Sequence, residues 1–204
     1  MPAGTAEFPE GSDYVPIHLT APLSLEDVKG LHAGDSVLLS GVVYTARDAA
    51  HERMAKAIEN GESLPISLIG QTLYYAGPTP TPPGKAVGSI GPTTSTRMDA
   101  YTPLLLSLGL RAMIGKGKRS PRVVEAMHEY PAVYFAAVGG AAALMAECVT
   151  ACEVVAYEDL GTESIKRLTL KDLPLIVAVD CHGGDYYELG QKGYRDGQQN
   201  RPAE

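Results

Sequence analysis

Short apolar runs rich in β-branched residues alternate along the chain with segments whose apolar residues recur every three or four positions. The first pattern is typical of buried strands, and the second is typical of helices that cover a sheet. Strands are therefore predicted over residues 15–20, 37–44, 64–76, 112–114, 133–138, 154–157, 165–170 and 175–180. Helices are predicted from Ser24 and over residues 48–60, 101–110, 120–130 and 139–148. Because strands and helices alternate in the middle and further strands lie at both ends, the pattern predicts a mixed α/β domain.

Local signals mark two of the helix starts and one loop. Ser24 is followed three residues later by Asp27, which is the pattern of a capping box. Ser120 precedes Pro121, and proline suits the first helical position because that position needs no N–H donor. Residues 77–84 contain four prolines and are expected to form a loop outside the sheet, since proline cannot donate to a strand ladder.

The two ends of the chain lack both periodic patterns. Residues 1–14 and 183–204 are polar and contain glycine or proline, so they are predicted to be tails that flank one folded domain over residues 15–182. The chain of 204 residues is 45% hydrophobic, and its 17 Lys and Arg against 24 Asp and Glu give a net charge of −7. These values favour a compact globular domain.

Neither a membrane span nor a signal peptide is expected. No apolar run approaches the roughly 20 residues that a spanning helix needs, and the N-terminus lacks the basic and apolar regions of a leader. A cytoplasmic location is therefore expected. Five cations and no acid lie within residues 111–122, but no aromatic residues are interleaved with them, so nucleic acid is not expected as a partner.

Three loops combine a cation with hydroxyl groups or glycines at predicted strand ends: residues 45–51, 91–99 and 115–117. In α/β proteins, ligands bind beyond strand ends, where glycines allow close approach and arginine binds carboxylates through two N–H groups. Two arginines and one lysine, Arg47, Arg97 and Lys116, suit a small dicarboxylate. They suit a nucleotide less well, because no phosphate-loop or dinucleotide motif is present.

Each of these residues also has an ordinary structural interpretation. Arg47 and Asp48 could form a surface ion pair, and the hydroxyl residues 93–96 could cap a helix. Lys116 could lie in a turn. His51, one helical turn after Arg47, fits a packed or supporting histidine as well as an acid–base group.

The three cysteines do not have the spacing of a metal site. Cys148 and Cys152 are separated by three residues, whereas the close pairs of iron–sulfur and zinc sites have other spacings. Cys181 stands alone beside His182, where nothing local fixes the geometry of a nucleophile. We expect reduced thiols and no metal ligands in this chain.

Five segments of the chain resemble one family of enzymes. They are YTARDAAHERM, LYYAGPTPTPPGKAVGSIGPTTSTRMDAYTPLLL, AMIGKGKRSPRVVEAM, GGAAALMAE and EVVAYEDLGTESIKRLTLKDLPLIVAVD. Together they are similar to the β region of the iron–sulfur hydro-lyases, which include class I fumarase and L(+)-tartrate dehydratase. The resemblance covers residues 15–182, and GPTTS-x-RMD followed by GKG is its most specific part.

The resemblance implies a swivelling β/β/α domain with a mixed sheet and flanking helices. Such a domain closes over a [4Fe–4S] cluster that is held by the cysteines of a partner α subunit, where the iron binds the substrate hydroxyl and a carboxylate oxygen. Arg47, Arg97 and Lys116 would then bind the carboxylates of a C4 dicarboxylate, and Thr93, with Lys116, would serve proton transfer. The residues expected to support them are Asp48, His51, Thr94 and Ser95.

The expected activity is the reversible hydration of fumarate to (S)-malate in a heterodimer or α2β2 heterotetramer, inactive without the α subunit. Fixed cations fit this reaction, because proton abstraction beside a carboxylate adds negative charge in the transition state. The alternatives are the β subunit of L(+)-tartrate dehydratase and a non-catalytic module that binds a dicarboxylate.

Overall fold

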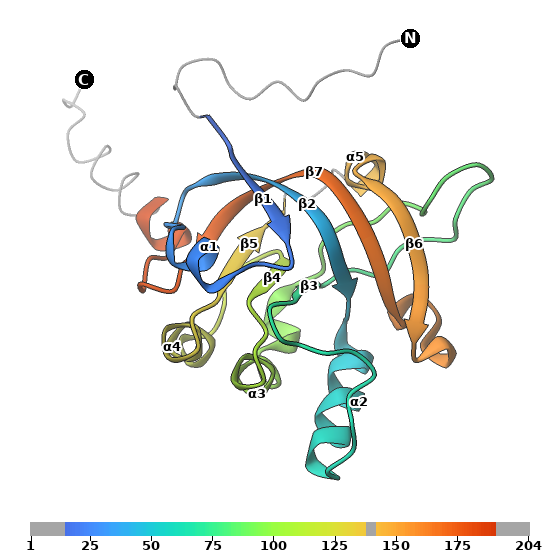
Figure 1. The fold of residues 1–204 in the computed structure, drawn as a ribbon, viewed down its shortest axis with the longest axis horizontal. Coiled ribbons are helices and arrows are strands. Elements are labelled where there is room, and N and C mark those ends of the chain that lie inside the picture. Colours follow the sequence, from blue (N-terminus) through green and yellow to red (C-terminus); the bar gives the residue numbers. More distant parts are fainter. Residues whose placement is uncertain (1–14, 138–141, 191–204) are drawn as a thin grey trace, which may run out of the picture.

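The computed structural model describes residues 15–137 and 142–190 (Figure 1). The elements in chain order are β1 (Ile17–Ala21), α1 (Leu25–Lys29), β2 (Ser36–Thr45), α2 (Asp48–Glu59), β3 (Thr72–Tyr74), the 3₁₀ helix η1 (Ser95–Met98), α3 (Thr102–Ser107), β4 (Ala112–Gly115), α4 (Pro121–Glu129), β5 (Val133–Ala136), α5 (Ala142–Glu147), β6 (Val149–Ala156), the 3₁₀ helix η2 (Glu158–Glu163) and β7 (Ile165–Val179). The predicted mixed α/β architecture with a sheet and flanking helices is confirmed.

The strands form one mixed sheet that curves back on itself. Strands β1 to β5 pair in parallel in chain order, and β7 runs antiparallel to β5, β2 and β6. Ile176 of β7 pairs with Ser36 of β2 on one side and with Ala136 of β5 on the other. The pairings of β2, β3, β4, β5 and β7 therefore close into a ring, which leaves β1 and β6 outside it.

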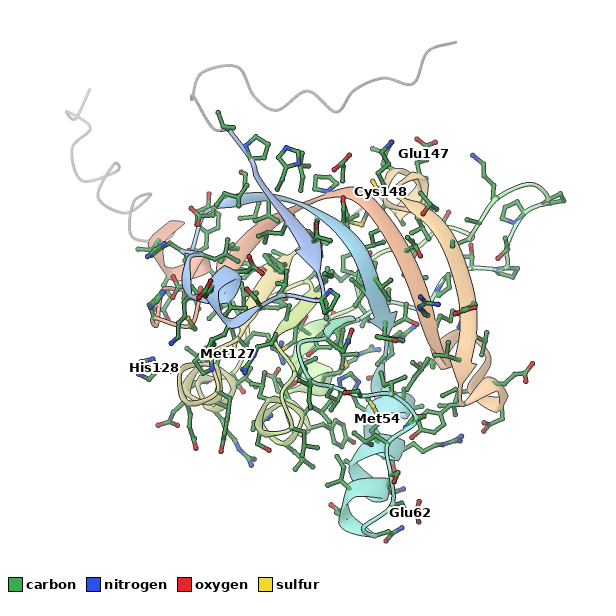
Figure 2. All side chains as sticks on the ribbon, viewed as in Figure 1. Met54, Glu62, Met127, His128, Glu147 and Cys148 are labelled. Atoms are coloured by element: carbon green, nitrogen blue, oxygen red, sulfur yellow. The ribbon has the colours of Figure 1, made fainter. Side chains whose placement is uncertain are left out.

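Alternation along the short parallel strands divides the core into two parts, because successive side chains point to opposite faces. One set packs against the helices α2, α3 and α4, and the other set faces β2 and β7 inside the ring. The first set is Leu73, Met113 and Tyr134, and the second is Tyr74, Ile114 and Phe135. Met54 of α2 and Met127 of α4 are fully buried in the helix-side core (Figure 2). The fold therefore has three layers: β2 with β7, then the short parallel strands, then the helices.

Three strand predictions differ from the structure. The strand predicted over residues 154–157 begins earlier, because the pairing of β6 with β7 starts at Val149. Within residues 64–76 only Thr72–Tyr74 is a strand, and the residues before it include the buried Leu68 and the 76% exposed Ile69. Residues 165–170 and 175–180 belong to one strand, β7. The polar residue between them, Asp172, has φ +50° and faces the bulge of β2, where its N–H donates to Ser40 Oγ at 2.9 Å. A bulge absorbs this polar position without ending the strand.

The helix starts also show one agreement and one difference. Ser24 and Asp27 form the predicted capping box, with Asp27 N donating to Ser24 Oγ at 3.0 Å. Ser120 stands at the start of α4, yet its hydroxyl does not cap the helix; instead its N–H donates to Asp99 Oδ2 at 2.7 Å. A carboxylate from the loop of residues 91–99 thus binds the N–H at the start of α4, where negative charge is favourable.

The described fold continues beyond residue 182. Asp180 accepts hydrogen bonds from the N–H groups of His182 and Gly184, both at 2.8 Å, and Tyr187 packs on the helix-side core. Residues 1–14, 191–204 and 139–141 of the predicted α5 helix lie outside the described residues, so the division into two tails and a body over 15–182 stays a prediction. In the described part of the chain, no helix is long and apolar enough to cross a membrane.

Candidate functional site

The three cation-bearing loops lie at the carboxyl ends of neighbouring parallel strands. Arg47 comes two residues after β2, and Lys116 directly follows β4. Between them, Thr93 N donates to the carbonyl of Tyr75, the residue after β3, at 2.7 Å. Because β2, β3 and β4 run in parallel, these ends share one edge of the sheet, which is where α/β proteins bind ligands.

A short stretch of backbone pairing joins Thr93 to Lys116. Lys116 N donates to Thr93 O at 3.3 Å, and Ser95 N donates to Lys116 O at 3.0 Å, so that Thr94 and Lys116 form a parallel bridge. Lys116 therefore ends a parallel strand and does not lie in a hairpin turn. Its side chain is exposed, as is Thr94, whereas Thr93 is half-buried.

Ser95 is buried and anchors the loop of residues 91–99. Its Oγ lies 2.8 Å from Tyr134 Oη, and that hydroxyl donates to Gly117 O at 2.9 Å. Gly115 is required beneath it, because a Cβ at this position would overlap Ser95 Oγ. These buried contacts connect the loop of residues 91–99, which we call the threonine loop, to residues 115–117.

Arg119 supports the same loop from inside the protein. Its side chain is fully buried and donates from Nε to Asp99 Oδ1 at 2.8 Å and from Nη2 to Thr102 Oγ1 at 2.8 Å. Arg111 likewise donates to Pro131 O at 3.1 Å. Two of the five cations in residues 111–122 thus stabilise the fold, and that segment is not a continuous basic surface.

Arg47 and Arg97 both approach the same oxygen of the Asp48 carboxylate. Asp48 Oδ2 is 3.6 Å from Arg47 Nη2 and 3.9 Å from Arg97 Nη1, which comes from η1. The Arg47 side chain is 22% exposed, so the predicted pair with Asp48 exists but is largely enclosed. Glu163 approaches Arg47 as well, at 3.4 Å. Among the described residues, neither guanidinium has a hydrogen-bond partner, although Arg47 Nε is itself buried.

Several buried polar atoms lie together in the first turn of α2. Arg47 Nε, Asp48 Oδ2 and His51 Nε2 are three of the five buried side-chain polar atoms without a partner in the described part of the chain. Buried polar groups are nearly always paired in folded proteins, so such a cluster requires an explanation. For Asp48 Oδ2, the two guanidinium groups at 3.6 and 3.9 Å supply part of it, since they compensate its charge without a hydrogen bond.

His51 is a packed, neutral histidine. Its ring is fully buried, contacts Tyr75 edge-on at 5.3 Å, and places Nδ1 2.9 Å from Arg47 O. Since a carbonyl only accepts, Nδ1 carries the proton. Burial lowers the pKa of His51 to about 4, so the ring holds no charge at neutral pH. Of the two interpretations of His51, the geometry favours the supporting one.

The thiols do not form a ligand set. Cys148 and Cys152 are half-buried at the start of β6, and Cys181 is buried after β7. Burial raises the pKa of all three thiols, which keeps them protonated at neutral pH. Within residues 15–137 and 142–190, no group of three or more His, Cys, Asp or Glu side chains is arranged to hold a metal ion. These residues therefore do not fit an iron–sulfur cluster.

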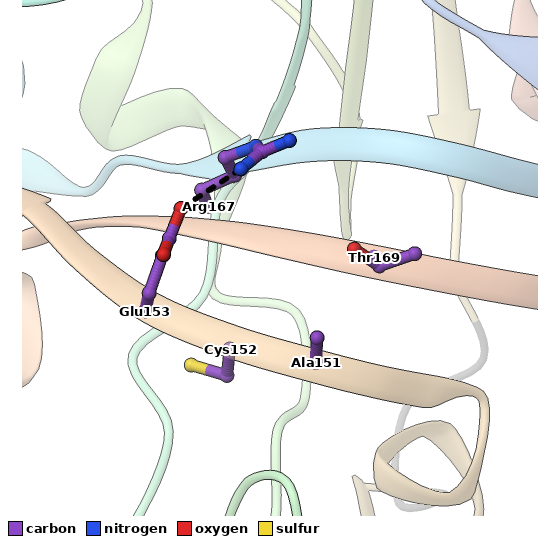
Figure 3. A pocket seen from close by; sticks show the side chains of 5 residues that line it. All are labelled: Ala151, Cys152, Glu153, Arg167 and Thr169. Atoms are coloured by element: carbon purple, nitrogen blue, oxygen red, sulfur yellow. Dashed lines mark hydrogen bonds and ion pairs between the residues drawn. The ribbon is translucent and has the colours of Figure 1, made fainter.

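A separate hollow of about 150 Å³ lies on the β6–β7 ribbon (Figure 3). It is lined by Ala151, Cys152, Glu153, Arg167 and Thr169. Arg167 donates to Glu153 at 2.9 Å across its surface, and both side chains are about half exposed. No predicted site residue lines this hollow, so it is distinct from the cation-bearing loops.

Sequence reasoning missed the roles of the residues that hold these loops in place. Glu163, Asp99, Tyr134 and Arg119 are far from their partners in the sequence. Glu163, Asp99 and Arg119 lie in segments of the family resemblance, but the resemblance assigned them no contact. Only the folded chain brings Glu163 to Arg47.

Comparison with known proteins agrees with the predicted family. The sequence profile of the family described as "Fumarase C-terminus" matches residues 2–190. The chain is 40% identical over 152 residues to "Fumarate hydratase class I, anaerobic" of Escherichia coli K12, covering 74% of this chain and 28% of that protein. It is 34% identical over 192 residues to "Fumarate hydratase class I, aerobic" of Salmonella typhimurium LT2, covering 92% of this chain and 33% of that protein.

A third relative has nearly the same length as this chain. The "Putative L(+)-tartrate dehydratase subunit beta" of Methanocaldococcus jannaschii is 38% identical over 172 residues, covering 81% of this chain and 88% of that protein. The chain thus spans about a third or less of the two fumarate hydratases and most of the β subunit. The family profile matches almost the whole length of the chain, and the chain therefore belongs to the fumarase C-terminus family.

Proposed function

We propose that the chain is the β part of an iron–sulfur hydro-lyase that hydrates a C4 dicarboxylate, with fumarate to (S)-malate as its reaction. The observation that carries the proposal is the pair of guanidinium groups of Arg47 and Arg97, which lie 3.6 and 3.9 Å from Asp48 Oδ2 and have no hydrogen-bond partner among the described residues. Membership of the fumarase family supports the choice of reaction.

In this proposal the cations hold the two substrate carboxylates. Arg47 and Arg97 bind one end or both through paired N–H donors, and the exposed Lys116 supplies a third positive charge from the adjacent loop. In the dehydration direction, a proton leaves the carbon beside a carboxylate and the negative charge on that carboxylate increases. Cations fixed in place stabilise this transition state more than the ground state.

Thr93 is the proposed group for proton transfer. It lies next to Lys116 through the backbone pairing of the two loops, so both side chains belong to the same edge of the sheet. A threonine hydroxyl is a weak base at its ordinary pKa, so a nearby cation has to stabilise its deprotonated form. We assign this task to Lys116, whose backbone N–H donates to the Thr93 carbonyl.

The proposal includes an α region as partner. The fumarate hydratase relatives are about three to four times as long as the matched segment, and the relative of similar length is named as a β subunit. Since the thiols described here do not fit a [4Fe–4S] cluster, we assign the cluster to the partner. The strand, strand, helix layering suits a swivelling domain that closes on that partner and excludes water.

The test is reconstitution with an α-type hydro-lyase chain under anaerobic conditions, followed by assays with fumarate, (S)-malate, tartrate and methyl-substituted relatives. We expect fumarate hydration by the pair and none by this chain alone. Turnover of tartrate in preference to malate would assign the chain to a tartrate dehydratase, a candidate that the β-subunit relative of similar length supports. Malate binding to the isolated chain by calorimetry, with no activity in any pair, would instead indicate a binding module.

A further inference from the structure

Glu163 contacts both Arg47 and the first turn of α2. Its Oε1 lies 3.4 Å from Arg47 Nη2, and its Oε2 accepts a hydrogen bond from the Ala49 N–H at 2.9 Å. Charge-assisted hydrogen bonds are usually about 2.7–2.9 Å long. At the longer separation of 3.4 Å, Glu163 attracts the Arg47 guanidinium by charge without accepting a hydrogen bond from it.

Residues 158–164, which we call the strap, carry Glu163 across the N-terminal half of α2. One end of the strap is fixed to α2 by Arg53, which donates to both carboxylate oxygens of Asp159 at 2.8 and 2.7 Å. The Arg53 guanidinium also lies over the ring of Tyr157, 4.8 Å from its centroid. The strap is thus attached to the same helix whose start carries Arg47.

The other end of the strap is fixed by Lys166, a buried lysine with no carboxylate partner in the described residues. Its Nζ donates to three neutral acceptors of the strap: Gly161 O at 2.9 Å, Thr162 O at 3.3 Å and Ser164 Oγ at 2.6 Å. Burial lowers the pKa of this lysine. These three hydrogen bonds hold the strap in place, and they partly offset the free-energy cost of removing the lysine charge from water.

Arg47 is enclosed between the strap and Gly77. A Cβ on Gly77 would come within 3.0 Å of Arg47 Nη1 and 3.1 Å of Thr162 O, so the guanidinium, the strap and the loop after β3 are in close contact. The strap is attached at both ends, and this holds the Glu163 carboxylate beside Arg47.

We infer that Glu163 is a positioning residue for Arg47: it holds the guanidinium toward the substrate carboxylate while leaving its donors free. This inference rests on the proposed role of Arg47 in binding a carboxylate. It goes beyond that role by stating that Glu163, in the connection between β6 and β7, sets the orientation of Arg47.

Two substitutions separate positioning from a simple capping role. The amide oxygen of Glu163→Gln can still accept from Ala49 N, whereas its charge beside Arg47 is lost; Glu163→Ala removes both. In the reconstituted enzyme, we expect both variants to lose about tenfold or more in kcat/KM, with unchanged subunit association. The matched control is Glu158→Gln in the same 3₁₀ helix, where the side chain is exposed and should leave kcat/KM within about twofold.

Two further measurements make the result specific to Arg47. In an Arg47→Met background, Glu163→Gln should change kcat/KM by less than about twofold, because the interaction is already gone. In the isolated, ¹⁵N-labelled chain, the Arg47 Nε–Hε resonance, assigned with Arg47→Lys, should shift or broaden in Glu163→Gln and stay unchanged in Glu158→Gln.

The outcomes separate this inference from the proposed function. Activity of Glu163→Gln close to wild type, with loss only in Glu163→Ala, would reduce Glu163 to a helix cap and overturn the inference. A full additional loss in the Arg47→Met background, or an unchanged Arg47 resonance, would overturn it too. If the wild-type pair hydrates no C4 dicarboxylate, the proposed function fails, and the Arg47 resonance still decides the role of Glu163.

Discussion

Arg119 donates a hydrogen bond from Nε to the carboxylate of Asp99 over 2.8 Å, inside the protein and directly beneath the threonine loop. The same carboxylate caps α4 by accepting from Ser120 N. Because the two charges are paired with each other, neither is free to bind a ligand. The pair instead stabilises the fold by connecting the loop of residues 91–99 to α4, the helix that follows Lys116.

Loss of the Asp99 charge should strongly destabilise the protein. Asp99→Asn leaves the fully buried Arg119 without its counter-ion, and breaking a buried ion pair in this way costs about 3–5 kcal/mol of unfolding free energy. Denaturant unfolding of the isolated chain measures it. Glu153→Gln is the control, since it breaks an ion pair of 2.9 Å that is exposed, and it should change stability far less. Equal effects of the two substitutions would contradict a buried role for Asp99.

The stability of the chain should fall as the pH drops from about 6.5 toward 4. The folded-state pKa of His51 is about 4 and its ordinary value is 6.5, so between these values the unfolded chain binds more protons. A shift of this size corresponds to about 3 kcal/mol of unfolding free energy, present above pH 6.5 and lost below it. Urea unfolding across this pH range should show the slope. His51→Gln should flatten it, while the exposed His18→Gln should retain it.

Substitution of Arg97 should remove turnover and leave assembly intact. Arg97 is 56% exposed and makes only a 3.9 Å ion pair with Asp48 among the described residues, so Arg97→Met costs the fold little. We expect kcat/KM of the reconstituted enzyme to fall by about 100-fold or more, since a carboxylate then lacks its paired donor. Arg122→Met, an exposed cation on α4, should retain activity. Residual activity within about tenfold of wild type would show that Arg97 is not a carboxylate ligand.

Gly115→Ala should displace the threonine loop. The new Cβ would overlap Ser95 Oγ and come within 3.0 Å of Tyr75 Cδ2, so the loop paired with Lys116 has to move. We expect lower thermal stability and a lower affinity for dicarboxylate in calorimetry. Adding Ser95→Ala removes the overlapping hydroxyl and should restore part of the stability. No restoration in the double variant would place the conflict elsewhere, at Tyr75.

Much of the fold was predictable because its signals are local. The capping box of Ser24 and Asp27, the helix that begins at Asp48 and the alternation of strands and helices depend on neighbours within a few residues. The closing of the ring was not predictable, since it depends on Ile176 pairing with both Ser36 and Ala136. Such long-range pairing leaves no periodic pattern in the sequence. The polar Asp172 interrupts the apolar pattern of β7, so two strands were predicted where the structure has one.

The sequence by itself determined the family of this protein and the candidate residues of its site: two arginines, a lysine and threonines at strand ends, with thiols whose spacing does not suit a cluster. The tertiary structure decided which charges stay available. It buried Arg119 on Asp99, made His51 neutral, and set Asp48 and Glu163 beside Arg47. The reason is physical, because the behaviour of a charged side chain depends on burial and on its nearest counter-charge, and both are fixed by contacts between residues distant in sequence.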